Sequence, residues 1–117
     1  MPLTFHSRFK VEGSGTLTAT GSEQTIREIT RVGKVQGYID FTNMVSGDAV
    51  IIRTYAKIKS GGSYVLQGNK NIYGTQYTPK LMQIYEFPTP QYGFKITLEQ
   101  TDGTNRSYDW MLFFEGQ

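Results

Sequence analysis

The stretch YGFKITLEQTDGTNRSYDWMLFF, residues 92–114, decides the fold class of this chain. Apolar and polar side chains alternate in it, and a period of two places them on opposite faces of a β-strand. The alternating apolar positions are Phe94, Ile96, Leu98, Trp110, Leu112 and Phe114. Asp102 and Gly103 stand between the two runs and tolerate the positive φ of a tight turn. The stretch therefore predicts a long antiparallel hairpin whose apolar face the rest of the chain must cover.

Turn residues divide the preceding chain into six further runs of strand-forming residues. These runs are 16–20, 24–31, 35–42, 49–59, 63–74 and 80–87. Ile26 and Ile29 are three residues apart, which fits a helical turn or a β-bulge; the β-branched neighbours favour a bulged strand. Gly and Ser at 13–15 are expected to break the chain, and Pro88 to form a bend outside any strand.

Eight short strands with Gly and Pro turns, and no run that predicts a helix of ten residues, indicate a sandwich or a barrel. Eight strands suit a jelly roll, whereas an immunoglobulin-like sandwich suits seven and commonly has a Cys pair. We therefore predict an all-β, eight-stranded, jelly-roll-like β-sandwich over residues 15–117, with residues 1–14 as an N-terminal arm or edge strand. The predicted core contains Ile39, Phe41, Val50, Ile52, Ile58, Phe94, Ile96, Leu98, Trp110 and Leu112.

The composition excludes several classes of protein. A chain of 117 residues predicts one domain, and the absence of Cys excludes disulfides, thiolate metal sites and cysteine nucleophiles. A formal net charge of +2 is too small to indicate a nucleic-acid-binding protein. No apolar run is long enough to span a membrane, and no secretory signal is visible at the N-terminus. The chain is expected to be soluble, without export by that route.

Few residues suggest catalysis or metal binding. His6 is the only histidine, so a His-rich metal site or a Ser-His pair would need partners close in space. Asp40 and Asp109 could share a sheet face, as a glycosidase pair would require, but solvated or ion-paired carboxylates are the favoured interpretation. Asn43, Ser46 and Asp48 could supply some oxygen ligands for calcium, but their spacing does not match an EF-hand loop. We therefore expect neither an enzyme nor a cofactor.

Candidate contact residues come from basic and aromatic positions. Arg53, Tyr55 and Lys57 alternate onto one strand face, which could bind single-stranded nucleic acid or an anionic partner, although a solvated face is favoured. Tyr is common at protein interfaces and in sugar-binding sites alike, and several tyrosines fall in or beside loops. The predicted interface or ligand contacts are Arg53, Tyr55, Lys57, Tyr73, Tyr77, Tyr92, Phe5 and Phe9.

Three segments, residues 15–30, 37–58 and 92–110, together resemble small β-sandwich proteins encoded by viruses and phages. The resemblance is one of pattern, without a diagnostic motif, and it implies a jelly-roll virion structural or decoration protein located in the virion. Other capsid proteins would then be partners. Surplus Tyr, Phe and Met predict a homo-oligomer, a trimer before a dimer, with residues 3–11 adding to a neighbour's sheet edge. The alternative is a carbohydrate-binding, lectin-like module. A nucleic-acid or membrane partner is not expected.

Overall fold

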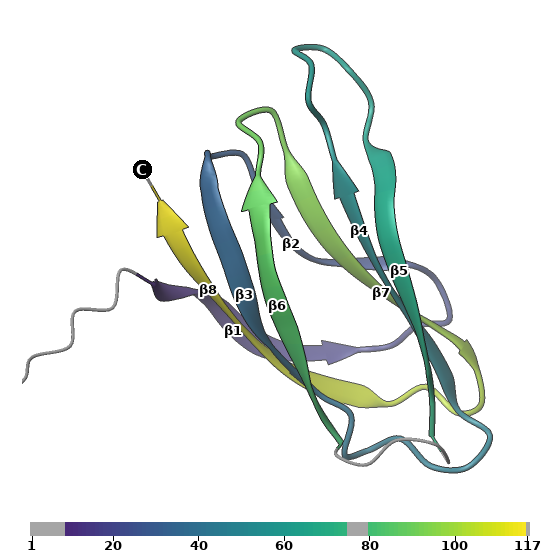
Figure 1. Ribbon diagram of the computed structural model, residues 1–117. Helices are drawn as coiled ribbons and strands as arrows, with labels where there is room; N and C mark the ends of the chain where they lie inside the picture. The colour runs from purple at the N-terminus through teal and green to yellow at the C-terminus, as the bar shows by residue number, and fades with distance from the viewer. Residues whose placement is uncertain (1–8, 75–79, 117) are drawn as a thin grey trace, which may run out of the picture.

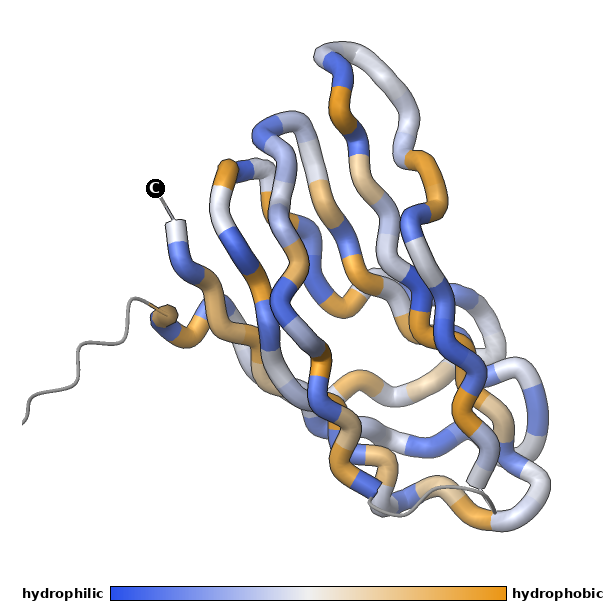
Figure 2. Tube along the Cα trace, in the orientation of Figure 1, coloured by the Kyte–Doolittle hydropathy of each residue, from blue (hydrophilic) through white to orange (hydrophobic). Residues whose placement is uncertain are grey.

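Eight β-strands form the part of the chain that the computed structural model describes, residues 9–74 and 80–116 (Figure 1). The strands are β1 (Lys10–Thr18), β2 (Gln24–Ile29), β3 (Gly33–Asp40), β4 (Ala49–Ala56), β5 (Val65–Tyr73), β6 (Leu81–Thr89), β7 (Phe94–Asp102) and β8 (Ser107–Gly116). Hydrophobic and hydrophilic residues alternate along several of these strands (Figure 2), as the sequence periodicity predicted.

The strands form two antiparallel four-stranded sheets. Sheet A has the order β1-β8-β3-β6, and sheet B has the order β2-β7-β4-β5. Successive strands alternate between the two sheets except at β4 and β5, which pair directly. This order is that of a jelly roll, so the predicted all-β, eight-stranded sandwich is confirmed.

The predicted hairpin of β7 and β8 is wrong, although both strands exist. β7 pairs with β2 and β4 in sheet B, whereas β8 pairs with β1 and β3 in sheet A. The turn residue Gly103, with φ of 82°, leads the chain from one sheet to the other. The apolar faces of the two strands thereby contribute to one core from opposite sheets, which buries more apolar surface than a hairpin with one shared face.

The core between the sheets contains most of the residues predicted for it. Those confirmed as buried are Ile39, Phe41, Val50, Ile52, Phe94, Ile96, Leu98 and Leu112. Trp110 is only partly buried and packs at the edge of the core. Ile58 is 83% exposed, contrary to the prediction. Strand β4 ends at Ala56, so the alternation that placed Ile58 inward does not extend to it.

Two expected interruptions lie inside strands. β1 continues through residues 13–15 because Gly13 and Gly15 leave room for the Trp110 ring; a Cβ atom at Gly13 would lie 3.2 Å from its Cη2 atom. Pro88 lies in β6, opposite Lys34 of β3. β6 is an edge strand of sheet A, where a missing backbone donor is tolerated. The predicted bulge in β2 is confirmed between Thr25 and Arg27.

Candidate functional site

The predicted basic face of β4 lies on the outer surface of sheet B, but its arginine is already paired. Arg53 Nη1 lies 2.7 Å from a Glu99 oxygen and 3.5 Å from a Glu23 oxygen. The Tyr55 hydroxyl donates to Glu23 Oε2 at 2.5 Å. Hydrogen bonding to Glu99 is the main reason that the pKa of Arg53 is raised. Arg53 and Tyr55 therefore hold sheet B together, and neither is left for an anionic ligand.

Two lysines and two tyrosines form a second layer beside this network. Lys95 Nζ lies 5.0 Å from the ring centroid of Tyr55 and 4.7 Å from that of Tyr64. Lys57 Nζ lies 4.5 Å from the Tyr64 centroid, and the Tyr64 hydroxyl donates to Glu28. Each contact is a cation–π interaction, worth about 0.5–1 kcal/mol at exposed sites. The aromatic rings of this face, which was considered for stacking on nucleic acid although a solvated face was favoured, thus contact lysines of the same chain.

Two tyrosines, Tyr64 and Tyr108, are expected to ionise only at high pH. Burial and the hydrogen bond to Glu28 raise the pKa of Tyr64 to about 12, and burial raises that of Tyr108 to about 12. Because a raised folded-state pKa stabilises the fold below the unfolded value of about 10, this stability will be lost between about pH 10 and 12. Ultraviolet titration of tyrosinate should show a late phase, and Tyr64→Phe should reduce its amplitude. An unchanged late phase in that variant would contradict the assignment.

The other predicted contact residues do not meet at one site. Tyr73 ends β5 and is 43% exposed, whereas Tyr92 precedes β7 and is 39% exposed. Tyr73 pairs with Ala49, the first residue of β4. Tyr92 lies two residues before Phe94, which pairs with Ala56 at the other end of β4, so the two tyrosines lie at opposite ends of sheet B. Phe9 directly precedes β1. Phe5 and Tyr77 lie outside the described residues.

Asp40 and Asp109 do share a sheet face, since they are direct partners of β3 and β8 on the outside of sheet A. Asp40 Oδ1 accepts hydrogen bonds from the Thr42 backbone at 2.8 Å and from its hydroxyl at 2.5 Å. Asp109 accepts from the Thr16 hydroxyl at 2.5 Å. In residues 9–74 and 80–116, no group of three or more metal-ligating side chains occurs. Each carboxylate is therefore explained by a local hydrogen bond.

Asp48, one of the oxygen ligands considered for calcium, is instead a buried structural carboxylate. Its Oδ2 atom accepts from Arg106 Nε at 2.9 Å and from the Val45 backbone at 3.0 Å. Its Oδ1 atom accepts from the Thr104 backbone at 3.2 Å. Nearby, the Gln100 amide accepts from the Tyr108 hydroxyl at 2.7 Å and donates to the Thr104 carbonyl. These bonds hold the connection through which the chain crosses from β7 to β8.

An apolar patch on the outer face of sheet A was not predicted. Tyr38 of β3 and Phe113 of β8 contact edge to face, with ring centroids 6.4 Å apart. Met111 is the direct strand partner of Tyr38, and Leu81 is the partner of Asp40 on β6. Val11 of β1 lies opposite Phe113. All five side chains retain exposed surface, and we call them the sheet A patch. The sequence signal was the apolar pair Met111 and Phe113 at positions that alternate with core residues.

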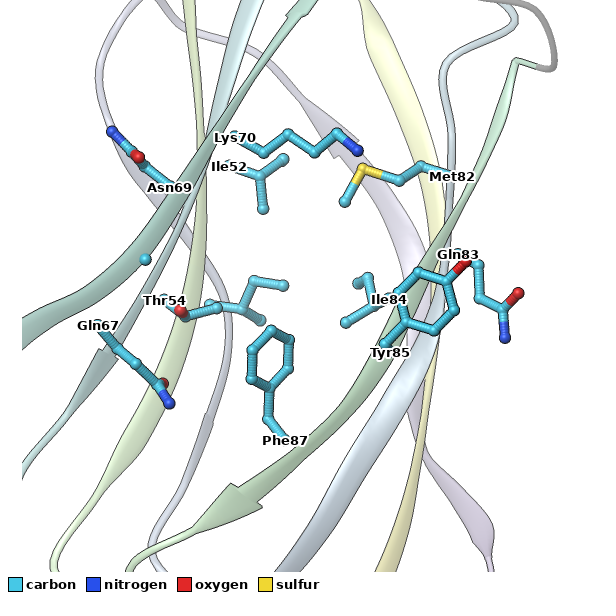
Figure 3. A pocket seen from close by; sticks show the side chains of 12 residues that line it. Ile52, Thr54, Gln67, Asn69, Lys70, Met82, Gln83, Ile84, Tyr85 and Phe87 are labelled. Carbon is cyan, nitrogen blue, oxygen red and sulfur yellow. The ribbon is translucent and has the colours of Figure 1, made fainter.

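A cavity of about 210 Å³ between edge strands β5 and β6 was also missed (Figure 3). Ile52, Ile84 and Phe87 contribute apolar surface to it, and Thr54 and Gly68 lie on the sheet B side. Lys70 is strand partner to the inward-facing Ile52, which places it on the inner face of β5. The signal that could have revealed it is this lysine, which occupies a core-facing position in the alternation.

Comparison with known proteins identifies a fold but no family. No family model and no curated protein matches the chain. A solved structure from Bacillus endospore appendages, described as a novel family of disulfide-linked pili, is similar over 99% of this chain and 98% of its own. The TM-score is 0.51 and the sequence identity 11%, so the likeness concerns the fold alone. Nothing helical in the described residues reaches the length and apolar character of a membrane-crossing helix.

Proposed function

We propose that this protein is a non-enzymatic structural subunit that works by contact with further copies of itself. The sheet A patch is the main support for this proposal, because Tyr38, Met111 and Phe113 lie side by side on the outer face of sheet A. Aromatic residues and Met are enriched in the buried centres of protein interfaces. Asp40 and Asp109, the carboxylates considered for catalysis, have local structural partners instead, whereas His6 lies outside the described residues. The partners of the two carboxylates support a role without chemistry.

The N-terminal segment supplies a second contact. β1 begins at Lys10 and is an edge strand of sheet A, and residues 3–9 precede it in the sequence. Leu3, Phe5 and Phe9 share one parity in this segment, as the apolar face of a strand would require. Addition of such a strand to the edge of a neighbour would satisfy backbone groups that are otherwise unpaired. Of the segment predicted to reach a neighbour, residues 3–11, Lys10 and Val11 already pair with β8, so we infer that the residues before β1 link one copy to the next.

The assembly we favour is a virion shell or its decoration, with a trimer preferred to a dimer and other capsid proteins as partners. Jelly-roll order supports this choice because capsid subunits commonly have it, although fold alone does not determine function. The similar appendage protein suggests a fibre as the alternative assembly. Since this chain has no Cys, any fibre of it would be held without disulfides. A carbohydrate-binding module has less support, because Tyr73 and Tyr92 form no common platform.

Light scattering at micromolar concentration should detect an oligomer that depends on the sheet A patch. Met111→Glu places a carboxylate in the patch and is expected to shift the population to monomer, because an unpaired buried charge is costly. The matched control Ser60→Glu, in an exposed loop, should leave the mass unchanged. Deletion of residues 2–8 should also lower the number of copies in the oligomer, and the variant should retain the β-sheet circular dichroism spectrum. A monomeric parent protein would overturn self-assembly, leaving attachment to a different protein.

A further inference from the structure

The two sides of the sandwich are closed differently. On the β1–β2 side, Glu12 of sheet A binds Arg27 of β2 at 3.0 Å and Arg31 at 2.5 Å. The Glu12 side chain is only 10% exposed, so this bridge covers the gap between the sheets. On the opposite side, no ion pair between described residues joins β5 to β6. The cavity opens on this second side.

Inside, the cavity is apolar and has room for a small group. Figure 3 shows Ile52, Ile84 and Phe87 directed toward the space between the sheets. Gly68 has no side chain to fill it; a Cβ atom there would meet only the Thr54 hydroxyl, at 3.6 Å. A cavity of about 150 Å³ can hold benzene, so a volume near 210 Å³ accommodates a single ring with a short chain.

A single cation marks the mouth. Lys70 is the one charged residue among those lining the cavity, and its side chain extends from β5 toward Met82 on β6 (Figure 3). It has no ion pair with any described residue. The other polar side chains of the lining are neutral, and Asn69 and Gln83, the strand partners of Arg53 and Tyr38, lie on the outer faces of the sheets, directed away from the cavity (Figure 3). A ligand that is complementary to this cavity would therefore carry one negative charge next to an apolar ring or chain.

We propose that the cavity between β5 and β6 binds a small amphiphilic carboxylate, with its apolar ring or chain against Ile52, Ile84 and Phe87. The carboxylate would lie at the Lys70 ammonium group. Small-molecule sites are commonly apolar pockets that contain a small number of polar groups. This site is independent of the proposed assembly, because the cavity lies between the two sheets, whereas the sheet A patch lies on the outer face of sheet A.

The test compares 3-phenylpropionate with 3-phenylpropanamide, which has the same shape without the charge. Titration monitored by amide chemical shifts should show perturbation at Gly68 and Ile84 for both compounds. The carboxylate should bind about two- to fivefold more tightly, the effect expected for a partly exposed ion pair. Lys70→Met should abolish that preference and retain binding of the amide. The matched control Lys10→Met, on the far edge of sheet A, should keep the preference.

Gly68→Leu provides the second arm, since its side chain would occupy the cavity. Binding of both compounds should fall at least about tenfold, with an unchanged circular dichroism spectrum. Equal affinity of the parent protein for the two compounds, or shifts confined to other residues, would overturn the proposal. So would shifts at Gly68 and Ile84 that follow protein concentration instead of ligand concentration, because a second copy of the chain would then be the occupant.

Discussion

Asp48→Ala is expected to lower the free energy of unfolding by about 3 kcal/mol. Asp48 is 3% exposed and accepts hydrogen bonds from Arg106 and from the backbones of Val45 and Thr104. Removing one partner of a buried ion pair costs about 3–5 kcal/mol. The lower end applies because the Arg106 side chain keeps 30% of its surface exposed and can turn toward water. Urea unfolding at neutral pH measures the difference.

The same variant should alter the acid side of the stability profile. Burial alone would raise the pKa of Asp48, but the hydrogen bonds from Arg106 and Val45 outweigh it and the pKa is lowered. A lowered folded-state pKa gives stability above the unfolded value of about 4, and this stability is lost as the pH falls through the folded-state value. Asp48→Ala should therefore show a shallower loss below about pH 4. Some loss will remain, because the pKa values of Glu12 and Glu23 are also lowered.

Asp102→Ala is the matched control. Asp102 is the last residue of β7, next to the same connection, but its side chain is exposed, and it is its backbone carbonyl that accepts a bond from Gln100. A surface substitution of this kind usually changes stability by no more than about 0.5 kcal/mol. If the two variants lose equal stability, the connection is sensitive to any change and the buried carboxylate has no special role.

The sequence predicted the strands better than it predicted their partners. Alternation identified β7 and β8 because side-chain period is a local property of the chain. Whether two neighbouring strands pair or cross between sheets depends on distant residues, here Asp48, which binds Arg106 of the connection. The same limit explains Pro88, whose place in β6 is tolerated only because β6 is an edge strand.

The candidate site shows a similar division. Alternation correctly placed Arg53 and Tyr55 on one outer face of β4. It could not show that Glu23 and Glu99 from other strands neutralise them. The cavity was equally hidden, because its lining comes from four successive strands, β4 to β7, of which β6 belongs to the opposite sheet and faces the other three only in the folded sandwich. The pattern of a single strand therefore predicts which side chains share a face. Whether those side chains are free to bind a ligand depends on the neighbouring strands in the assembled sheets.

Phe94→Ala is expected to be the most damaging core substitution, with a loss of about 3–5 kcal/mol in the free energy of unfolding. Phe94 is 1% exposed and lies at the start of β7, with its ring centroid 6.0 Å from that of Phe87 in the opposite sheet. Its removal leaves a cavity that neighbours from both sheets must fill. Urea unfolding measures the loss, with Phe94→Leu as a milder variant in case the alanine variant does not fold.

Trp110→Ala is the matched comparison, because it removes a larger ring at less cost. Trp110 is partly exposed and covers Gly13 and Gly15 of the edge strand β1, so water can replace part of its contact surface. Its loss of stability should therefore be clearly smaller than that of Phe94→Ala. A larger loss at Trp110 would mean that the contact between Trp110 and β1 stabilises the sandwich more than the packing of β7 against β6. The stability of the domain would then depend on the closed β1–β2 side.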